Sequence, residues 1–189
     1  MFESLPDIPR LFTALAEWGA ALVYVFVVAR SASSNALNPN AAIPRWRLAV
    51  AAVGGLVVLV SAQELLGRAP LSLWVPGMMT AYALMWGVIR VGTALDWRWV
   101  THMSARAFIV AELAASLAWQ VVVYSHSDKP YWHPLSFGGF AAIAATCLAV
   151  VYFFERRIYR QGALPILRFA DLASGVLIGI AIFALSNLS

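Results

Sequence analysis

Charged residues and cysteines are scarce in this sequence. Only 12% of its 189 residues are charged, whereas a soluble globular domain has about 25%. So few charges cannot cover a water-facing surface, which excludes an ordinary soluble domain. The single cysteine, Cys147, excludes an internal disulfide and a thiolate zinc site, and its apolar surroundings favour a small buried side chain.

Hydrophobic residues are abundant instead, at 62%, and the mean hydropathy is +0.78. They gather in six runs, and about 20 apolar residues are enough to span a bilayer as a helix. We therefore predict an all-α polytopic membrane protein, a single domain over 1–189 that forms a bundle of six transmembrane helices. The third run contains Pro76-Gly77 near its start, which predicts a kink or a re-entrant turn there. The predicted spans are 11–29, 48–66, 71–91, 100–124, 137–154 and 172–188.

The basic residues predict the orientation, because cytoplasmic loops carry an excess of Lys and Arg. The connections on one side hold Arg30, Arg45, Arg47, Arg90, Arg98, Arg156, Arg157, Arg160 and Arg168, whereas the opposite side holds only Arg10, Arg68 and Lys129. The N-terminus is therefore expected outside, and six spans put the C-terminus outside as well. Glu3 and Asp7 stand where a signal peptide would be basic, so the first run is expected to remain as a helix.

Apart from Arg90, which is counted with the connection at the end of the third run, four charged residues fall within predicted spans, where charges are costly and usually face a bundle interior or a cavity. They are Glu17, Glu64, Arg106 and Glu112. With the N-terminus outside, Glu17 and Glu64 lie in the outer halves of their helices and Glu112 is central. Glu112, Ser116 and Gln120 recur every fourth residue and form one polar stripe, which we predict to point inward. These positions predict an outward-opening ligand-binding pocket bounded by Glu17, Glu64, Glu112, Ser116 and Gln120.

Arg106 lies near the inner face of the membrane, where Glu155 and Asp171 are its candidate partners by depth. Such an ion pair would hold helices together, and we favour this structural role over ligand recognition. Ala107, Ala111 and Ala115 recur at the same four-residue spacing, which lets another helix approach closely.

Catalysis has no support in the sequence, so we expect the chain not to be an enzyme and to need no cofactor. His102, His126 and His133 lack the HExxH spacing, and only His102 lies near a span, which leaves a haem without two histidine ligands. His126, Asp128 and His133 share one loop that offers metal ligands, but a solvated loop is the favoured interpretation. The basic residues are scattered between apolar runs, so no nucleic-acid binding is expected.

Three stretches resemble a known family when taken together: 7–18 (DIPRLFTALAEW), 71–78 (LSLWVPGM) and 105–120 (ARAFIVAELAASLAWQ). They resemble the N-terminal membrane domain of GHKL-type sensor histidine kinases from gut-dwelling Gram-positive bacteria, and the resemblance runs through most of the chain to its final SNLS. It implies a bacterial cytoplasmic membrane and a homodimer. In that family the chain continues through a further membrane segment to a kinase. No ATP-binding domain, dimerisation helix or phospho-accepting histidine follows here, so the resemblance implies a truncated or split receptor whose kinase output domain is on a separate chain.

The leading prediction is therefore a membrane-embedded signal-sensing domain of a two-component system, without a catalytic domain of its own. The acids of the predicted pocket favour an extracellular peptide or a small cationic ligand. The alternative is a small transporter or channel subunit, in which the same acids would handle protons or cations. A third hypothesis is an assembly protein whose polar residues only hold its helices together in the lipid bilayer.

Overall fold

The structure, a computed structural model, describes residues 8–34, 43–70, 73–93, 95–125 and 132–159. These residues are almost entirely helical and contain no strand, which confirms the prediction of an all-α protein for this part of the chain. The elements are α1 (Arg10–Ser34), α2 (Arg45–Ala49), the π-helical turn η2 (Val50–Gly54), α3 (Gly55–Leu66), α4 (Trp74–Thr93), α5 (Trp97–Ser125) and α6 (Pro134–Tyr159).

The helix count differs from the predicted six. α2, η2 and α3 follow one another without a break, so the described residues form five helices, and the sixth predicted span, 172–188, lies outside them. Four helices are long and apolar enough to cross a membrane, namely Arg10–Ser31, Arg45–Leu66, Trp97–Ser125 and Pro134–Tyr159. α4, which corresponds to the predicted span 71–91, is not among them because Arg90, two tryptophans and a tyrosine lower its hydropathy.

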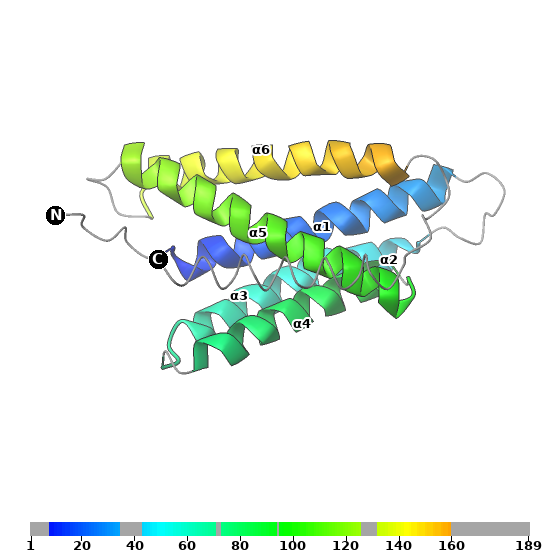
Figure 1. The fold of residues 1–189 in the computed structure, drawn as a ribbon, viewed down its shortest axis with the longest axis horizontal. Helices are drawn as coiled ribbons and strands as arrows, with labels where there is room; N and C mark the ends of the chain where they lie inside the picture. The colour runs from blue at the N-terminus through cyan, green and yellow to red at the C-terminus, as the bar shows by residue number, and fades with distance from the viewer. Residues whose placement is uncertain (1–7, 35–42, 71–72, 94, 126–131, 160–189) are drawn as a thin grey trace.

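Successive helices run antiparallel, as Figure 1 shows. The start of α1, the end of α3, the start of α4, the end of α5 and the start of α6 lie at one end of the bundle, and the opposite helix ends lie at the other. α1 is the central helix, because it contacts α3, α4, α5 and α6. In its apolar span 67% of the residues are buried, against 11% in that of α6. α6 instead exposes large apolar side chains such as Phe153 and Ile158, as a lipid-facing helix does.

Two glycines allow the helices around α1 to approach closely. A Cβ atom added at Gly92 of α4 would stand 2.8 Å from both Cγ methyl groups of Val25 in α1 and 3.1 Å from the Cβ of Ala51 in η2. A Cβ added at Gly55 of α3 would lie 3.0 Å from a methyl group of Val88 in α4. Small residues at such crossings let helices pack by direct backbone approach, which is how helices associate in a bilayer.

We expect Gly92→Ala to lower the free energy of unfolding by about 1–3 kcal/mol, because the added methyl group overfills a closed contact. Gly87 in the same helix is the matched control, since no heavy atom would lie within 4 Å of a Cβ there. Gly87→Ala should be neutral or stabilise the helix by up to about 1 kcal/mol. Denaturant titrations in detergent micelles, followed by circular dichroism, measure both; equal effects would contradict the packing at Gly92.

The π-helical turn η2 is linked to α1 by a side-chain hydrogen bond. The indole Nε1–H of Trp18 in α1 donates a hydrogen bond to the Ala52 carbonyl in η2, at 2.7 Å. A side chain that enters the backbone ladder in this way is a recognised cause of a local change in helical winding. The bond holds α1 against η2, directly before the start of α3. α3 carries one of the polar residues discussed below.

Pro76-Gly77 does not interrupt α4, so the predicted re-entrant turn is wrong. The helix is continuous over Trp74–Thr93, with Pro76 in its first turn. The first four N–H groups of a helix have no intrahelical partner, so a proline there costs no hydrogen bond.

Candidate functional site

Two groups of polar side chains lie inside the bundle, both against α1. Glu17 and Tyr24 of α1 are seven residues apart and therefore share one face of the helix, about 10 Å from each other along its axis. We name the group around Glu17 the first polar cluster and the group around Tyr24 the second polar cluster. The first comprises Arg10, Glu17, Gln63 and Glu112, and the second comprises Tyr24, Arg106, Glu155 and Tyr159.

A carboxyl–amide pair forms the centre of the first polar cluster. The Glu17 side chain is 0% exposed and that of Gln63 in α3 is 1% exposed. Gln63 Nε2 donates a hydrogen bond of 2.8 Å to Glu17 Oε1. The other oxygens of the pair, Glu17 Oε2 and Gln63 Oε1, are buried and have no hydrogen-bond partner among the described residues. Such orphaned buried acceptors are rare in folded proteins, which calls for a functional or chemical reason.

Two charged side chains act on Glu17 electrostatically, Glu112 from α5 and Arg10 from the start of α1. Arg10 also acts on Glu112, whose Oε1 is buried and lacks a partner within the described ranges. The aliphatic part of Arg10 packs against the end of α3, since a Cβ at Gly67 would lie 2.9 Å from its Cγ. Two carboxyl groups therefore interact with each other and with the half-buried Arg10 in this part of the bundle.

The structure departs from the predicted pocket at Glu64. Glu64 is exposed, whereas its neighbour Gln63 is buried and meets Glu17. Successive residues of a helix point about 100° apart, so both cannot face α1. The buried face of α3 consists of Gly55, Leu59 and Gln63, which recur every fourth residue.

The predicted polar stripe of α5 also faces inward only in part. Glu112 and Ser116 are half-buried and Gln120 is exposed. Residues spaced by four turn about 40° further around the helix at each step, so the stripe leaves the interface by Gln120. The buried face of α5 is mainly alanine, in agreement with the predicted close helix approach. In the structure Glu17 and Glu112 interact electrostatically, whereas the Glu64 and Gln120 side chains are exposed.

The second polar cluster joins α1, α5 and α6. Arg106 Nη2 lies 2.5 Å from Glu155 Oε1, and the Tyr24 hydroxyl donates to the same oxygen at 3.1 Å. Glu155 is 3% exposed and Arg106 is 37% exposed. Glu155 is one of the two partners predicted for Arg106; the other, Asp171, lies outside the described residues. Tyr159 packs edge-on against Trp99 beside this pair, with ring centroids 6.4 Å apart.

Sequence reasoning missed Gln63 and Tyr24 as site residues, although the sequence contains a signal for each. Gln63 continues the four-residue spacing of Gly55 and Leu59, which places it on a packing face of α3. Tyr24 stands seven residues after Glu17, which places both on one face of α1. Periodicity, rather than charge alone, was the informative property.

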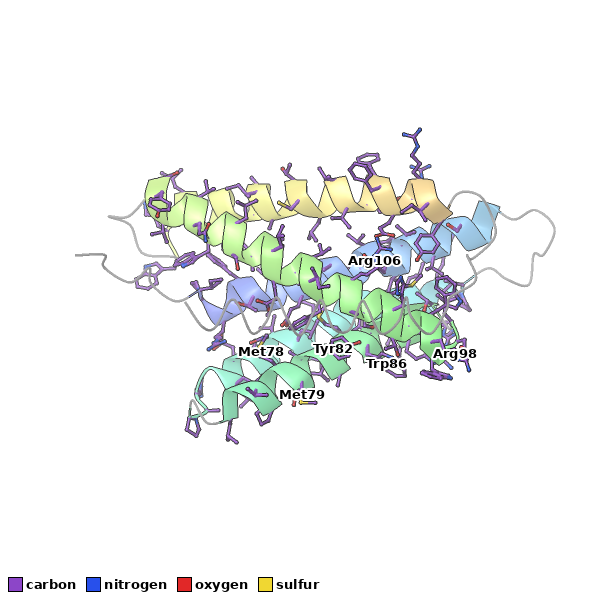
Figure 2. The ribbon with its side chains drawn as sticks, viewed as in Figure 1. Met78, Met79, Tyr82, Trp86, Arg98 and Arg106 are labelled. Carbon is purple, nitrogen blue, oxygen red and sulfur yellow. The ribbon has the colours of Figure 1, made fainter. Side chains whose placement is uncertain are left out.

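A further set of contacts positions α4 against α5 without charge. Trp86 Nε1 donates to Thr101 Oγ1 at 3.1 Å, and the Tyr82 hydroxyl donates to the Thr101 carbonyl at 3.3 Å. Figure 2 shows Met78, Tyr82 and Trp86 in a row along α4. The Tyr82 ring meets Phe108 of α5 edge-on, with centroids 6.0 Å apart. This contact region is aromatic and serves helix packing.

In the part of the chain that the structure describes, no three His, Cys, Asp or Glu side chains gather. Of the loop residues considered as metal ligands, His126 and Asp128 lie outside the described ranges. His133 accepts a hydrogen bond from the Leu135 backbone N–H at its Nδ1, 3.3 Å away, at the start of α6.

No family model, curated protein or solved structure matches this sequence.

Proposed function

We propose that the chain is a signal-sensing membrane domain in which the first polar cluster receives the signal. The observation that carries this proposal is Glu17, a fully buried carboxyl on α1, the helix that contacts α3, α4, α5 and α6. Ionisable residues inside membrane spans are costly and usually functional. Three buried oxygens, on Glu17, Gln63 and Glu112, have no hydrogen-bond partner among the described residues, which gives the cluster capacity for a cationic or hydrogen-bond-donating ligand.

The second polar cluster supplies a route for the response. The first cluster joins α1, α3 and α5, and the second joins α1, α5 and α6. A ligand that binds one arrangement of α1 and α5 more tightly shifts the population toward it. The same shift changes how Arg106 and Tyr24 meet Glu155 near the end of α6. The coupling between the two clusters is then the sensing event.

The orientation that we propose has the N-terminus outside and the second polar cluster near the cytoplasm. The asymmetry of basic residues supports it, because such residues mark the cytoplasmic side. Among the described residues, Arg30, Arg45, Arg47, Arg90, Arg98, Arg156 and Arg157 belong to one end of the bundle, and Arg10 and Arg68 to the other.

The family resemblance extends the proposal to an output. It supports a bacterial cytoplasmic membrane, a homodimer and a kinase output domain that receives the signal. The ligand class proposed from the acids is an extracellular peptide or a small cation.

A kinase fusion tests the sensor proposal. The full chain is joined through one added apolar helix to a cytoplasmic histidine kinase, and autophosphorylation is measured in membrane vesicles. Glu17→Gln and Glu112→Gln should each change the kinase output by at least about fivefold, the lower end for allosteric coupling. Glu64→Gln is the matched control, because this acid is exposed one position away from Gln63. Unchanged output in both interior variants would refute the proposal.

The same fusion without the added helix tests the orientation, since six spans and an outside N-terminus leave the kinase on the side that lacks ATP. It should be inactive, and an active kinase would contradict this topology.

The alternative, a small transporter, uses the same acids to move protons or cations. Proton flux into proteoliposomes that disappears in Glu17→Gln would favour the transporter over the sensor.

A further inference from the structure

The orphaned oxygens of the Glu17–Gln63 pair share one chemical property, which is that both are hydrogen-bond acceptors. Gln63 Nε2 already donates to Glu17 Oε1 at 2.8 Å, so the carboxyl and the amide lie side by side. Glu17 Oε2 and Gln63 Oε1 remain, both buried and without a partner in the described segments. An ionised carboxylate has no hydrogen to donate, whereas a protonated one has an O–H group. One proton on Glu17 Oε2 would add a donor to this pair, in which two buried acceptors lack one within the described part of the chain.

The charges around Glu17 require the same single proton. Glu112 of α5 and Arg10 of α1 are the charged groups that act on Glu17, and α3 contributes the neutral Gln63. α4 and α6 also contact α1 but bring no ionisable group to Glu17 among their described residues. Arg10 acts on both acids, so two ionised carboxylates would leave one negative charge uncompensated. An unpaired charge in the interior strongly destabilises the folded chain.

We infer that the Glu17–Gln63 pair is a proton-binding site, in which Glu17 carries one exchangeable proton and Glu112 is the acid that Arg10 compensates. The protonated carboxyl then accepts the hydrogen bond from Gln63 Nε2 at one oxygen and carries a donor on the other. Because Glu17 lies on the central helix, loss of this proton leaves α1 with a charge that its packing does not satisfy. The use of this proton as the sensed ligand rests on the proposed function, whereas its binding does not.

Carbodiimide labelling of the full chain in lipid vesicles tests the site. Dicyclohexylcarbodiimide enters bilayers and reacts with a protonated carboxyl: the carboxyl oxygen bonds to the carbodiimide carbon and its proton moves to nitrogen. The acyl group then migrates to nitrogen and leaves a stable adduct that peptide mass spectrometry locates. We expect the adduct at Glu17, with a rate that falls about tenfold per pH unit once the group ionises.

Two variants keep this experiment decisive. Glu17→Gln keeps the size of the side chain and should lose the adduct, whereas Glu64→Gln should label as the parent does. No adduct at Glu17 over the whole pH range, in protein whose circular dichroism shows folded helices, would overturn the inference. If sodium chloride, but not choline chloride, prevents the labelling of Glu17 at constant pH, the inference is overturned in favour of a metal-ion site with the same oxygens.

The labelling result and the kinase result fail separately. If Glu17 is labelled as expected but the output of the fused kinase does not change in the Glu17 and Glu112 variants, the proton site is supported and the sensor proposal is refuted. If the kinase output depends on both acids but Glu17 is not labelled, the sensor proposal is supported and its ligand is not a proton on Glu17.

Discussion

Arg106→Gln is expected to lower the free energy of unfolding by about 3 kcal/mol, at the low end of the range for a broken buried ion pair. The reason is Glu155, which is 3% exposed and would lose its only charged partner among the described residues. Arg106 itself is 37% exposed, so solvent or lipid head groups screen part of the interaction and the upper end of that range does not apply. Tyr24 still donates to the isolated carboxylate, but one neutral hydrogen bond does not replace a cation.

A double variant of Arg106 and Glu155 distinguishes loss of the ion pair from general destabilisation of the fold. Glu155→Gln removes the buried charge and keeps a side-chain oxygen for Tyr24, so adding it to Arg106→Gln should restore part of the stability. We expect a coupling energy of about 0.5–3 kcal/mol from the cycle, measured by denaturant titration in micelles. Arg98→Gln on the same helix is the control, because Arg98 is exposed and rests on the Trp97 ring. Its effect should stay within about 0.5 kcal/mol, and strictly additive Arg106 and Glu155 effects would contradict the ion pair.

Hydropathy predicted the helices themselves well. The predicted span 100–124 corresponds to α5 (Trp97–Ser125) and 137–154 to α6 (Pro134–Tyr159). α6 is longer than predicted because Arg156 and Arg157 continue the helix beyond the apolar run, and cations suit a helix C-terminus. The position of α1 at the centre was not predictable in this way, since lipid and protein interior are both apolar and hydropathy does not distinguish them.

The depth of the candidate site residues in the membrane was predictable from the sequence. The direction in which their side chains point was not. Counting residues along a helix gives the depth of Glu17, Glu112 and Arg106, because each residue adds about 1.5 Å along the axis. Whether a side chain faces a neighbour depends on which face of its helix packs. On α3 that face is set by Gly55 and Leu59, which selects Gln63 and leaves Glu64 exposed.

The central claim is that Glu17 meets Gln63 inside the bundle, and cross-linking tests it most directly. In a Cys147→Ala background, Glu17→Cys is combined with either Gln63→Cys or Glu64→Cys, and membranes are treated with a short thiol-reactive cross-linker. The two pairs differ by one position on α3, but only Gln63 points toward α1. We expect nearly complete linkage for the 17–63 pair and little for the 17–64 pair. Equal linkage of both pairs, or stronger linkage through position 64, would contradict the account.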